Sequence, residues 1–183
     1  MKKTTSALLA VLGTATLAGR AQAQVPVPNI TPFSVEARAG LSVPLSPASD
    51  NAKTGWTAGA NVTYHALPLV GVYAGYTLDE WKAKDADGKF QSQAISVGAR
   101  IGIPTPMIPI DPWIKVGAVN DRIKITDNSS GASLTGDRKW GFEAGAGLGF
   151  TLGPKLSVTP GVTYTKVKDL KFVRADIGLR VRI

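Results

Sequence analysis

The last eight residues of the chain alternate strictly between apolar and polar side chains. One face carries aliphatic residues, namely Ile177, Leu179, Val181 and Ile183. The other face carries charged or small residues, namely Asp176, Gly178, Arg180 and Arg182. Strict alternation indicates a β-strand, because successive side chains of a strand point to opposite faces. Other segments repeat the pattern, so we expect the apolar face to contact lipid and the charged face to line a narrow barrel.

The start of the chain has the features of a secretory signal peptide. Two lysines follow Met1, the stretch Ala7–Ala18 is mostly apolar, and Ala21-Gln22-Ala23 has the small-x-small form of a cleavage site. We therefore predict that residues 1–23 direct export and are removed. A retained membrane anchor is the alternative, but the apolar stretch is short for a spanning helix and is interrupted by glycine and threonine.

Composition narrows the function classes. The chain has no cysteine, which excludes disulfides and thiol chemistry. Lys and Arg number 21 against 13 Asp and Glu, and the excess persists after the signal peptide is removed. The sequence contains no run of basic residues and no basic helix of the kind that binds nucleic acid, so we predict no nucleic-acid binding. Basic residues at alternate strand positions instead favour a barrel lumen or contacts with anionic lipid headgroups.

After the signal peptide, the chain divides into eight strand-like stretches separated by turn-forming residues. Each stretch is long enough to cross a bilayer as a tilted strand, and an even number lets the first and last strands meet without an exposed edge. We predict an all-β fold, an eight-stranded antiparallel up-and-down transmembrane barrel over residues 33–183, after a proline-rich lead-in at 24–32. The predicted strands are Phe33–Val43, Gly55–Ala66, Val70–Trp81, Phe90–Ile103, Trp113–Ile125, Lys139–Leu152, Leu156–Val167 and Phe172–Ile183.

The sixth stretch shows why the apolar face should point outward. Its apolar face includes Trp140, Phe142 and Leu148, while the opposite face holds Glu143 and several glycines. Glycine weakens a strand, and a solvated face gains nothing from it. In a narrow barrel, small residues make room for long side chains that cross the lumen. A soluble periplasmic barrel that buries the apolar face and binds an apolar ligand is the alternative.

Two stretches depart from alternation. In the fifth, Ile123 and Ile125 fall on the polar face, and we predict a bulge near Val119–Asp121 that restores the register. In the seventh, Pro160 stands among the apolar positions. Because proline removes a ladder hydrogen bond, we predict a second bulge there.

Aromatic residues and loop lengths orient the predicted barrel. With both ends of the barrel in the periplasm, Trp56, Trp140 and Phe142 fall near the outer rim, and Tyr64 and Phe150 fall near the inner rim. Aromatic side chains favour these interfaces. Three of the outer connections are polar and mostly longer than the inner ones, as expected for outer-membrane barrels. Four aromatic residues have lumen parity and are predicted at or beyond the rims, namely Trp81, Phe90, Trp113 and Phe172.

The whole pattern resembles the small eight-stranded outer-membrane β-barrels of the OmpA/OmpX type. The most specific part of the resemblance is the C-terminal assembly signal of that class, polar-x-Gly-x-x-apolar-x-apolar. Its positions are filled in order by Asp176, Gly178, Val181 and Ile183, where the family usually ends in phenylalanine. The resemblance implies location in the outer membrane of a didermic bacterium, contact with its lipids, including lipopolysaccharide-like lipids, and recognition by the outer-membrane assembly machinery.

Charged residues with inward parity form the main chemical constellation. They are Glu36, Arg38, Arg100, Lys115, Glu143, Arg174, Asp176, Arg180 and Arg182. Buried ions need partners, and the first and last strands are neighbours at closure. We therefore expect Glu36 to pair with Arg180 or Arg38, and Asp176 and Glu143 to pair with other cations. We interpret the set as a plug that fills the narrow interior. The alternative is a narrow pore whose selectivity the arginines set.

No catalytic, cofactor or metal site is predicted. The single histidine, His65, falls at the predicted periplasmic end of a strand, the wrong side for chemistry on surface lipids. The segment Asp85–Lys89 resembles the start of a calcium loop, but Ser96 stands where its closing glutamate belongs. The glycines of the sixth stretch have strand spacing and no helix follows, which excludes a phosphate-binding loop. We expect a monomeric, non-enzymatic protein of the envelope, with a role in its structure or in surface interaction.

Overall fold

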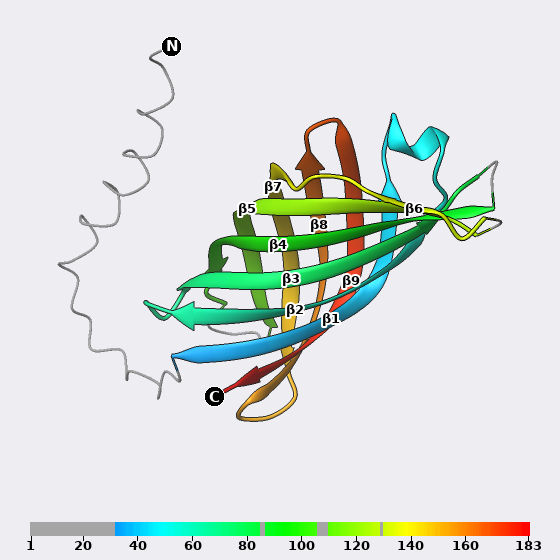
Figure 1. Cartoon of the computed structure of the whole chain (residues 1–183). Helices are drawn as coiled ribbons and strands as arrows, with labels where there is room; N and C mark the ends of the chain where they lie inside the picture. Colours follow the sequence, from blue (N-terminus) through cyan, green and yellow to red (C-terminus); the bar gives the residue numbers. More distant parts are fainter. Residues whose placement is uncertain (1–31, 85–86, 106–109, 129) are drawn as a thin grey trace, which may run out of the picture. The chain divides into compact units, whose positions relative to one another are not determined.

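The computed structural model describes residues 32–84, 87–105, 110–128 and 130–183. Its strands form one antiparallel sheet in the order β4-β3-β2-β1-β9-β8-β7-β5, and β4 also pairs with β5, which closes the sheet into a barrel (Figure 1). The barrel strands are β1 (Phe33–Pro44), β2 (Gly55–His65), β3 (Val70–Lys82), β4 (Gly88–Gly102), β5 (Ile110–Asp127), β7 (Lys139–Thr151), β8 (Leu156–Val167) and β9 (Leu170–Arg182). The predicted signal peptide, and the lead-in up to residue 31, lie outside the described residues.

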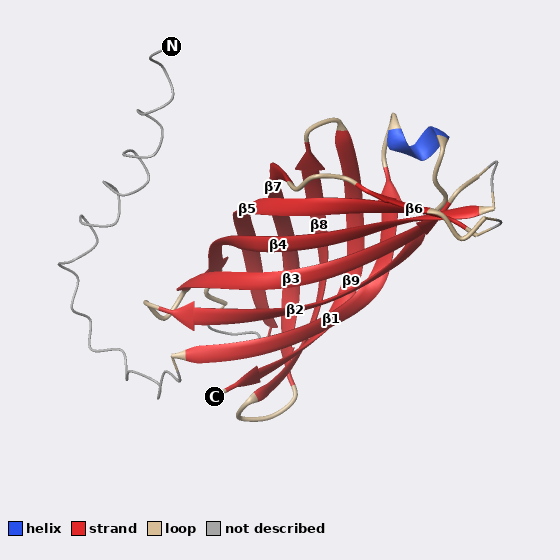
Figure 2. Cartoon of the chain, viewed as in Figure 1, coloured by secondary structure: helices blue, strands red, loops and turns tan. Residues whose placement is uncertain are grey.

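The predicted eight-stranded antiparallel barrel is confirmed, and the strand bounds differ from the prediction only at their ends. Two small elements are additional: β6 (Ser133–Thr135), which pairs with one end of β5, and η1 (Ala48–Asp50), a single 3-10 turn between β1 and β2 (Figure 2). Among the described residues, no helix is long and apolar enough to cross a membrane.

The two ends of the barrel differ in their connections. The seam pairs β1 with β9 from Ser34 opposite Arg182 to Pro44 opposite Phe172, so the barrel chain starts and finishes at the same end. We call this the turn end, because it also holds the connection at 66–69 and the tight turn at 152–155. The opposite, loop end holds η1, β6 and the connection at 83–87.

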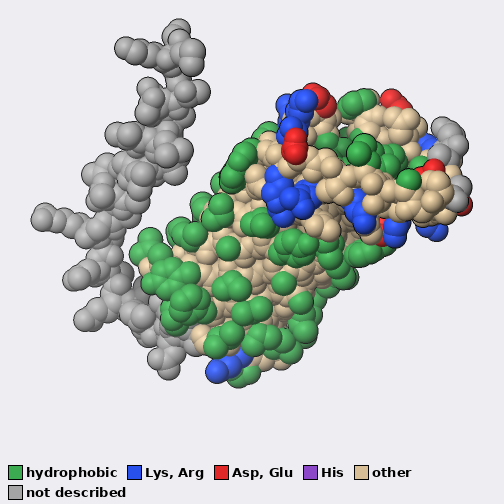
Figure 3. Space-filling model, in the orientation of Figure 1, with side chains coloured by type: hydrophobic (Ala, Val, Ile, Leu, Met, Phe, Trp, Pro, Cys, Tyr) green, Lys and Arg blue, Asp and Glu red, His purple; other side chains and the backbone are tan. Residues whose placement is uncertain are grey.

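Apolar side chains cover the outside of the barrel. Trp140 is 70% exposed and Ile177 is 62% exposed, and Figure 3 shows hydrophobic side chains over the wall that faces the viewer. An apolar surface of this extent is unfavourable in water, whereas the hydrocarbon core of a bilayer requires it. The soluble-barrel alternative, which would bury this face, is therefore wrong. Of the predicted rim aromatics, Trp56 and Phe142 are exposed towards the loop end and Tyr64 towards the turn end.

β5 contains no bulge, so the prediction of one near Val119–Asp121 is wrong. Its pairing with β4 is continuous, and its pairing with β7 runs one to one up to Asp121. Beyond Asp121, β5 separates from β7 and continues towards the loop end beside β4 and β6. The two isoleucines with inward parity, Ile123 and Ile125, lie on this extension and line an apolar cavity.

The prediction of a bulge at Pro160 is also wrong. β8 keeps a single register with β7 on both sides of the proline, because Gly147 pairs with Gly161 and Phe150 pairs with Val158. The rungs at Thr159 and Pro160 are missing from that ladder, while the ladder between β8 and β9 is continuous. The proline therefore interrupts hydrogen bonding on one side of β8 without inserting a residue.

Candidate functional site

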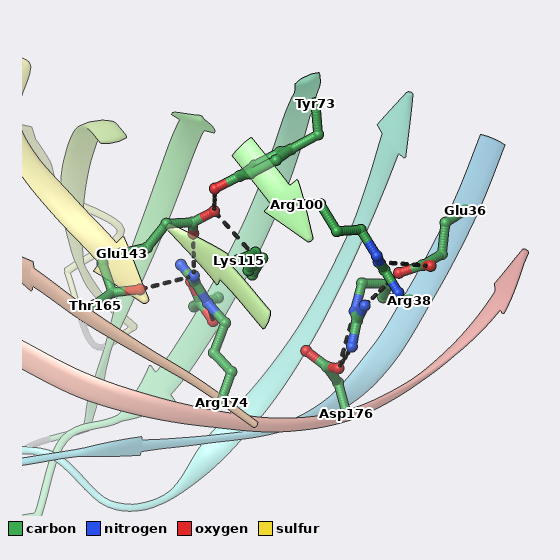
Figure 4. Close-up of polar contacts among 10 residues, drawn as sticks. Glu36, Arg38, Tyr73, Arg100, Lys115, Glu143, Thr165, Arg174 and Asp176 are labelled. Carbon is green, nitrogen blue, oxygen red and sulfur yellow. Dashed lines mark hydrogen bonds and ion pairs between the residues drawn. The ribbon is translucent and has the colours of Figure 1, made fainter. Parts of the chain in front are cut away.

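Glu36 on β1 is the centre of a buried ion cluster in the half of the lumen nearer the turn end (Figure 4). Arg180 on β9 donates from Nε to Glu36 at 2.8 Å, and Arg100 on β4 donates from Nη1 at 3.2 Å. Arg38 on β1 contacts both Glu36 and Asp176 of β9. Both expected partners of Glu36, Arg180 and Arg38, are therefore in the cluster, and Arg38 also pairs with Asp176. Three arginines thus share two carboxylates across the seam between the first and last strands.

A second cluster surrounds Glu143 on β7 (Figure 4). Tyr73 on β3 donates its hydroxyl to Glu143 at 2.6 Å, and Lys115 on β5 donates at 3.1 Å. Arg174 on β9 lies 3.7 Å from Glu143 and donates to both carboxylate oxygens of Asp79, from Nη2 at 2.8 Å and from Nε at 3.0 Å. This two-pronged arginine–carboxylate geometry is the stronger form of ion pair, and it connects β3 to β9 across the barrel.

Asp79 and Asp121 belong to the network but were not among the residues expected in it. Both are buried, and Asp121 accepts a hydrogen bond from Ser92 at 2.7 Å. Asp79 has inward parity on its strand, so alternation alone could have identified it. Asp121 was missed because the bulge predicted at Val119–Asp121 left its face unassigned. With these two acids, the enclosed cations and anions of the described lumen are equal in number: Arg38, Arg100, Lys115, Arg174 and Arg180 against Glu36, Asp79, Asp121, Glu143 and Asp176.

Arg182 is the predicted network residue that the structure places apart. It lies at the turn end of β9, where its Nη2 is 3.5 Å from the carboxylate of Asp111. The side chain of Asp111 is 53% exposed, so this pair lies in solvent at the mouth of the barrel. An exposed ion pair of this kind contributes little to stability.

Trp113 lies inside the lumen behind the turn-end mouth, rather than at or beyond the rim as predicted. The guanidinium of Arg100 is 4.0 Å from the centre of its ring, in the geometry of a cation–π contact. Glycines on β7 and β8 make room for the indole. A Cβ added at Gly147 would lie 2.4 Å from the ring, and one added at Gly161 would lie 2.7 Å from it. These two glycines therefore serve the packing role expected of small residues in a narrow barrel.

Little free space remains between the two ion clusters. The cavity there has a volume of about 10 Å³, and its lining includes Arg38, Lys115, Arg174 and Asp176. A volume of about one probe sphere holds at most a single water molecule. The side chains that line this cavity therefore leave little free volume between the clusters.

Two aromatic rings separate the charged lumen from the loop end. Trp81 on β3 and Phe172 on β9 are both buried and pack edge to face, with their ring centres 5.3 Å apart. The indole nitrogen of Trp81 donates to the backbone oxygen of Ser42 at 3.2 Å. On the lumen side, the guanidinium of Arg174 is 4.6 Å from the centre of the Phe172 ring. The aromatic pair thus covers the ion network.

The histidine faces the opposite mouth. His65 is the last residue of β2, and its Nε2 lies 3.1 Å from the hydroxyl oxygen of Ser34, which is buried. Within the described parts of the chain, no group of His, Cys, Asp and Glu is arranged to hold a metal ion. Two residues of the calcium-like segment, at 85–86, lie outside the described residues, and Asp87 accepts a hydrogen bond from the side chain of Asn128 at 3.0 Å.

The residues of the expected assembly signal fall on both faces of the last strand. Asp176 and Gly178 point inward, where a Cβ on Gly178 would lie 2.4 Å from the hydroxyl of Thr159. Val181 and Ile183 are exposed on the outer face. The polar half of the signal is therefore enclosed in the barrel, and its apolar half remains on the surface.

Comparisons with known proteins agree with this architecture. Residues 4–182 match the family model of the outer membrane protein beta-barrel domain, and no curated protein matches the chain. Neisserial surface protein A is similar in structure, with a TM-score of 0.70, 19% identity, and coverage of 82% of this chain and 97% of its own. The attachment invasion locus protein Ail of Yersinia pestis has a TM-score of 0.59 and 18% identity, with coverage of 82% and 97%. OprG of Pseudomonas aeruginosa has a TM-score of 0.56 and 11% identity, with coverage of 82% and 96%. The chain therefore belongs to the outer membrane protein β-barrel domain family and is an outer-membrane protein that lies among the lipids of a Gram-negative-type envelope.

Proposed function

We propose that this protein is a non-conducting, non-enzymatic barrel that contributes to envelope structure or to interactions at the cell surface. The observation that carries the proposal is the cavity of about 10 Å³ between two buried ion clusters. A conducting pore needs a continuous path of water, and the small volume of this cavity supports a closed lumen.

The energetics of the ion clusters support a permanent plug. Glu36 has three arginines around it, and Arg174 is held by Asp79 and lies near Glu143. Removing one partner of a buried pair leaves an uncompensated charge, which costs about 3–5 kcal/mol. Opening a path would require several such pairs to separate together. The closed arrangement is therefore expected to persist.

Features of the loop end support a role at the surface. Outer-membrane barrels carry their longer loops outside the cell, and here the loop end carries exposed lysines such as Lys53, Lys84 and Lys168. Ail, which shares the fold, has been crystallised with the heparin analogue sucrose octasulfate. An anionic surface ligand is accordingly the partner class that the loop-end charge of this chain favours.

The contact between Ser34 and His65 has the residue types of a nucleophile and a base, but its position does not favour catalysis. The hydroxyl of Ser34 is buried, and the pair lies at the turn end, away from lipids of the outer leaflet. Nucleophilic catalysis also needs a third group that orients the base, and within the described residues the ring of His65 contacts Ser34 itself. We expect the His65→Ala variant to leave the acylation pattern of lipid A unchanged in cells. A changed pattern would restore the enzymatic alternative.

We further propose that the outer-membrane assembly machinery recognises β9 through the apolar residues that end the chain. The exposure of Val181 and Ile183 supports this role. Replacing Ile183 with lysine should lower the amount of folded barrel in the outer membrane, while replacement with phenylalanine should preserve it. Equal amounts for the two variants would argue against recognition through this position.

Conductance in planar lipid bilayers tests the plug. We expect the wild-type protein to give no steady openings. The double variant Asp79→Ala/Arg174→Ala removes both partners of one pair but leaves the Glu36 cluster and the Trp81–Phe172 pair in place, so we expect it to remain silent as well. Steady anion-selective openings of the wild type would overturn the plug and favour the narrow-pore alternative.

A further inference from the structure

The loop end contains a cavity of about 500 Å³ that no part of the proposed plug uses. It lies between the connection that carries η1 and the ends of β3, β4, β5 and β9. Its lining is apolar except for Asn51. The principal wall residues are Ala52, Trp81, Phe90, Ile123, Ile125 and Leu170. A cavity of this size and composition matches the usual range of small-ligand sites, about 300–1,000 Å³.

The walls of this cavity are apolar, whereas inward positions farther along β5 carry charged residues. On β5, Lys115 and Asp121 point into the lumen and take part in its polar contacts. Ile123 and Ile125 continue the same inward parity, yet Ile125 is exposed at the loop end of the barrel. Apolar surface that is left open to water in a concave site marks a place where another molecule binds.

The cavity ends inside the protein. Trp81 lines it, and the pair formed by Trp81 and Phe172 separates it from Arg174 and the ion network. An apolar ligand could therefore enter from the loop end but could not continue through the lumen. The cavity is closed at its inner end, so its shape is that of a binding site and not of a channel.

Cations stand next to wall residues of the cavity in the sequence. Lys82 and Lys84 flank the wall residue Ala83, and Arg122 and Lys124 flank Ile123. Neighbouring residues of a strand point to opposite faces, so these charges lie on the outside of an apolar wall. Figure 3 shows Lys and Arg side chains, together with some Asp and Glu, at the same end of the barrel. Positive charge at this end of the barrel favours a negatively charged group near the opening.

From these features we propose that the loop-end cavity binds the acyl chain of an amphiphile whose headgroup is anionic. The chain occupies the space between Phe90, Ile123 and Leu170, and the headgroup lies near the cations of the loop end. Two sources share this chemistry: a free long-chain fatty acid, and an acyl chain of an anionic lipid of the outer leaflet. The site is separate from the plug, so either proposal can fail without the other.

Tryptophan fluorescence in lipid nanodiscs without detergent tests the site. The double variant Trp56→Phe/Trp140→Phe removes the tryptophans that face lipid and leaves Trp81 at the cavity and Trp113 in the lumen. The probe is a long-chain fatty acid brominated in the middle of its chain, which quenches an indole that it touches. We expect saturable quenching in this background and its loss when Trp81→Phe is added.

A wall variant and a matched control locate the effect. Ile125→Asp places a charge in the apolar wall at an exposed position, so the fold should survive. We expect it to weaken binding of the fatty acid by about tenfold or more, because burying an unpaired charge beside a hydrocarbon chain is costly. Leu152→Asp makes the same kind of change at the opposite end of the barrel, where Leu152 is exposed, and should leave binding unchanged. Heat-dependent gel mobility verifies that both variants are folded.

The headgroup is tested with the alcohol of the same chain length. We expect the alcohol to bind more weakly than the acid, and we expect salt to reduce the difference. Quenching by the brominated acid assigns the site to free fatty acids. Quenching by a brominated anionic phospholipid in the nanodisc, without added acid, assigns it to membrane lipid. The absence of both, or quenching that Ile125→Asp does not alter, would overturn the proposal. Equal binding of alcohol and acid would overturn the anionic headgroup.

Discussion

Inward positions of β5 carry Lys115 and Asp121 within the barrel, but Ile123 and Ile125 beyond the point where β7 separates from it. Inside the closed wall, a charge is enclosed and needs a partner from another strand, as Lys115 has in Glu143. Beyond that point β5 lies beside β4 and the short β6 instead of β7, and the same inward face meets other loop-end residues and the surroundings. Strand alternation therefore specifies which face a residue occupies. Closure of the barrel decides whether that face must carry paired charges or can carry apolar side chains.

The two regions should respond differently to substitution. Ion pairs provide the interactions of the lumen, and aromatic packing provides those of the loop-end mouth.

Replacing Glu36 with glutamine should destabilise the barrel most. The change removes the carboxylate that Arg38, Arg100 and Arg180 share, and an uncompensated buried charge costs about 3–5 kcal/mol. Urea unfolding in liposomes, followed by gel mobility, measures the loss. Glu80→Gln is the matched control, because Glu80 is paired with the partly exposed Lys89 and should lose less than about 1 kcal/mol. Equal losses for the two variants would mean that the lumen is solvated.

Replacing Trp81 with alanine should remove about 3 kcal/mol of stability, because a buried aromatic ring is lost from its contact with Phe172. The ion clusters lie on the other side of Phe172, so we expect the Trp81→Ala barrel to remain silent in planar bilayers. Openings in this variant would show that the aromatic pair, rather than the ion network, closes the lumen.

Replacing Gly147 with alanine should cost about 1–3 kcal/mol, since the added Cβ would overlap the Trp113 ring and the backbone oxygen of Pro160. Gly153 has open space at the corresponding position and provides the control. Thermal unfolding of the two alanine variants compares them directly. A Gly147→Ala barrel as stable as Gly153→Ala would show that the lumen is packed more loosely than the structure indicates.

Replacing Asp111 with asparagine should have the smallest effect, less than about 1 kcal/mol, because its pair with Arg182 is exposed. The effect should also diminish at high ionic strength, whereas the effect of Glu36→Gln should not. Unfolding in urea at low and high salt provides the measurement. A loss at Asp111 that rivals the loss at Glu36 would remove the distinction between the mouth and the enclosed lumen.

Alternation in the sequence predicted the fold and much of the ion network. It placed Glu36 and Arg180 on the inner face of the first and last strands, and closure of the barrel then made them neighbours. The balance between glycine and large side chains also predicted the orientation of the two faces, as the packing of Gly147 against Trp113 illustrates.

Alternation could not predict where a strand leaves the barrel. Ile123 was therefore interpreted as a break in register, and the same assumption removed Asp121 from the expected network. The depth of Trp113 was also missed, because parity gives no position along the barrel axis relative to the mouth. The loop-end cavity depends on residues from five separate segments, and no local pattern in the sequence brings them together.

We infer that side chains close the lumen between its two mouths. Because the chain has no cysteine, single cysteines can report the access of a water-soluble, membrane-impermeant maleimide. Thr163 is buried beside the central cavity, and Ala83 lines the loop-end cavity. We expect the Ala83→Cys variant to be labelled from outside the cell, and the folded Thr163→Cys variant to remain unlabelled until the barrel is unfolded. Labelling of folded Thr163→Cys at a rate close to that of Ala83→Cys would contradict a closed lumen.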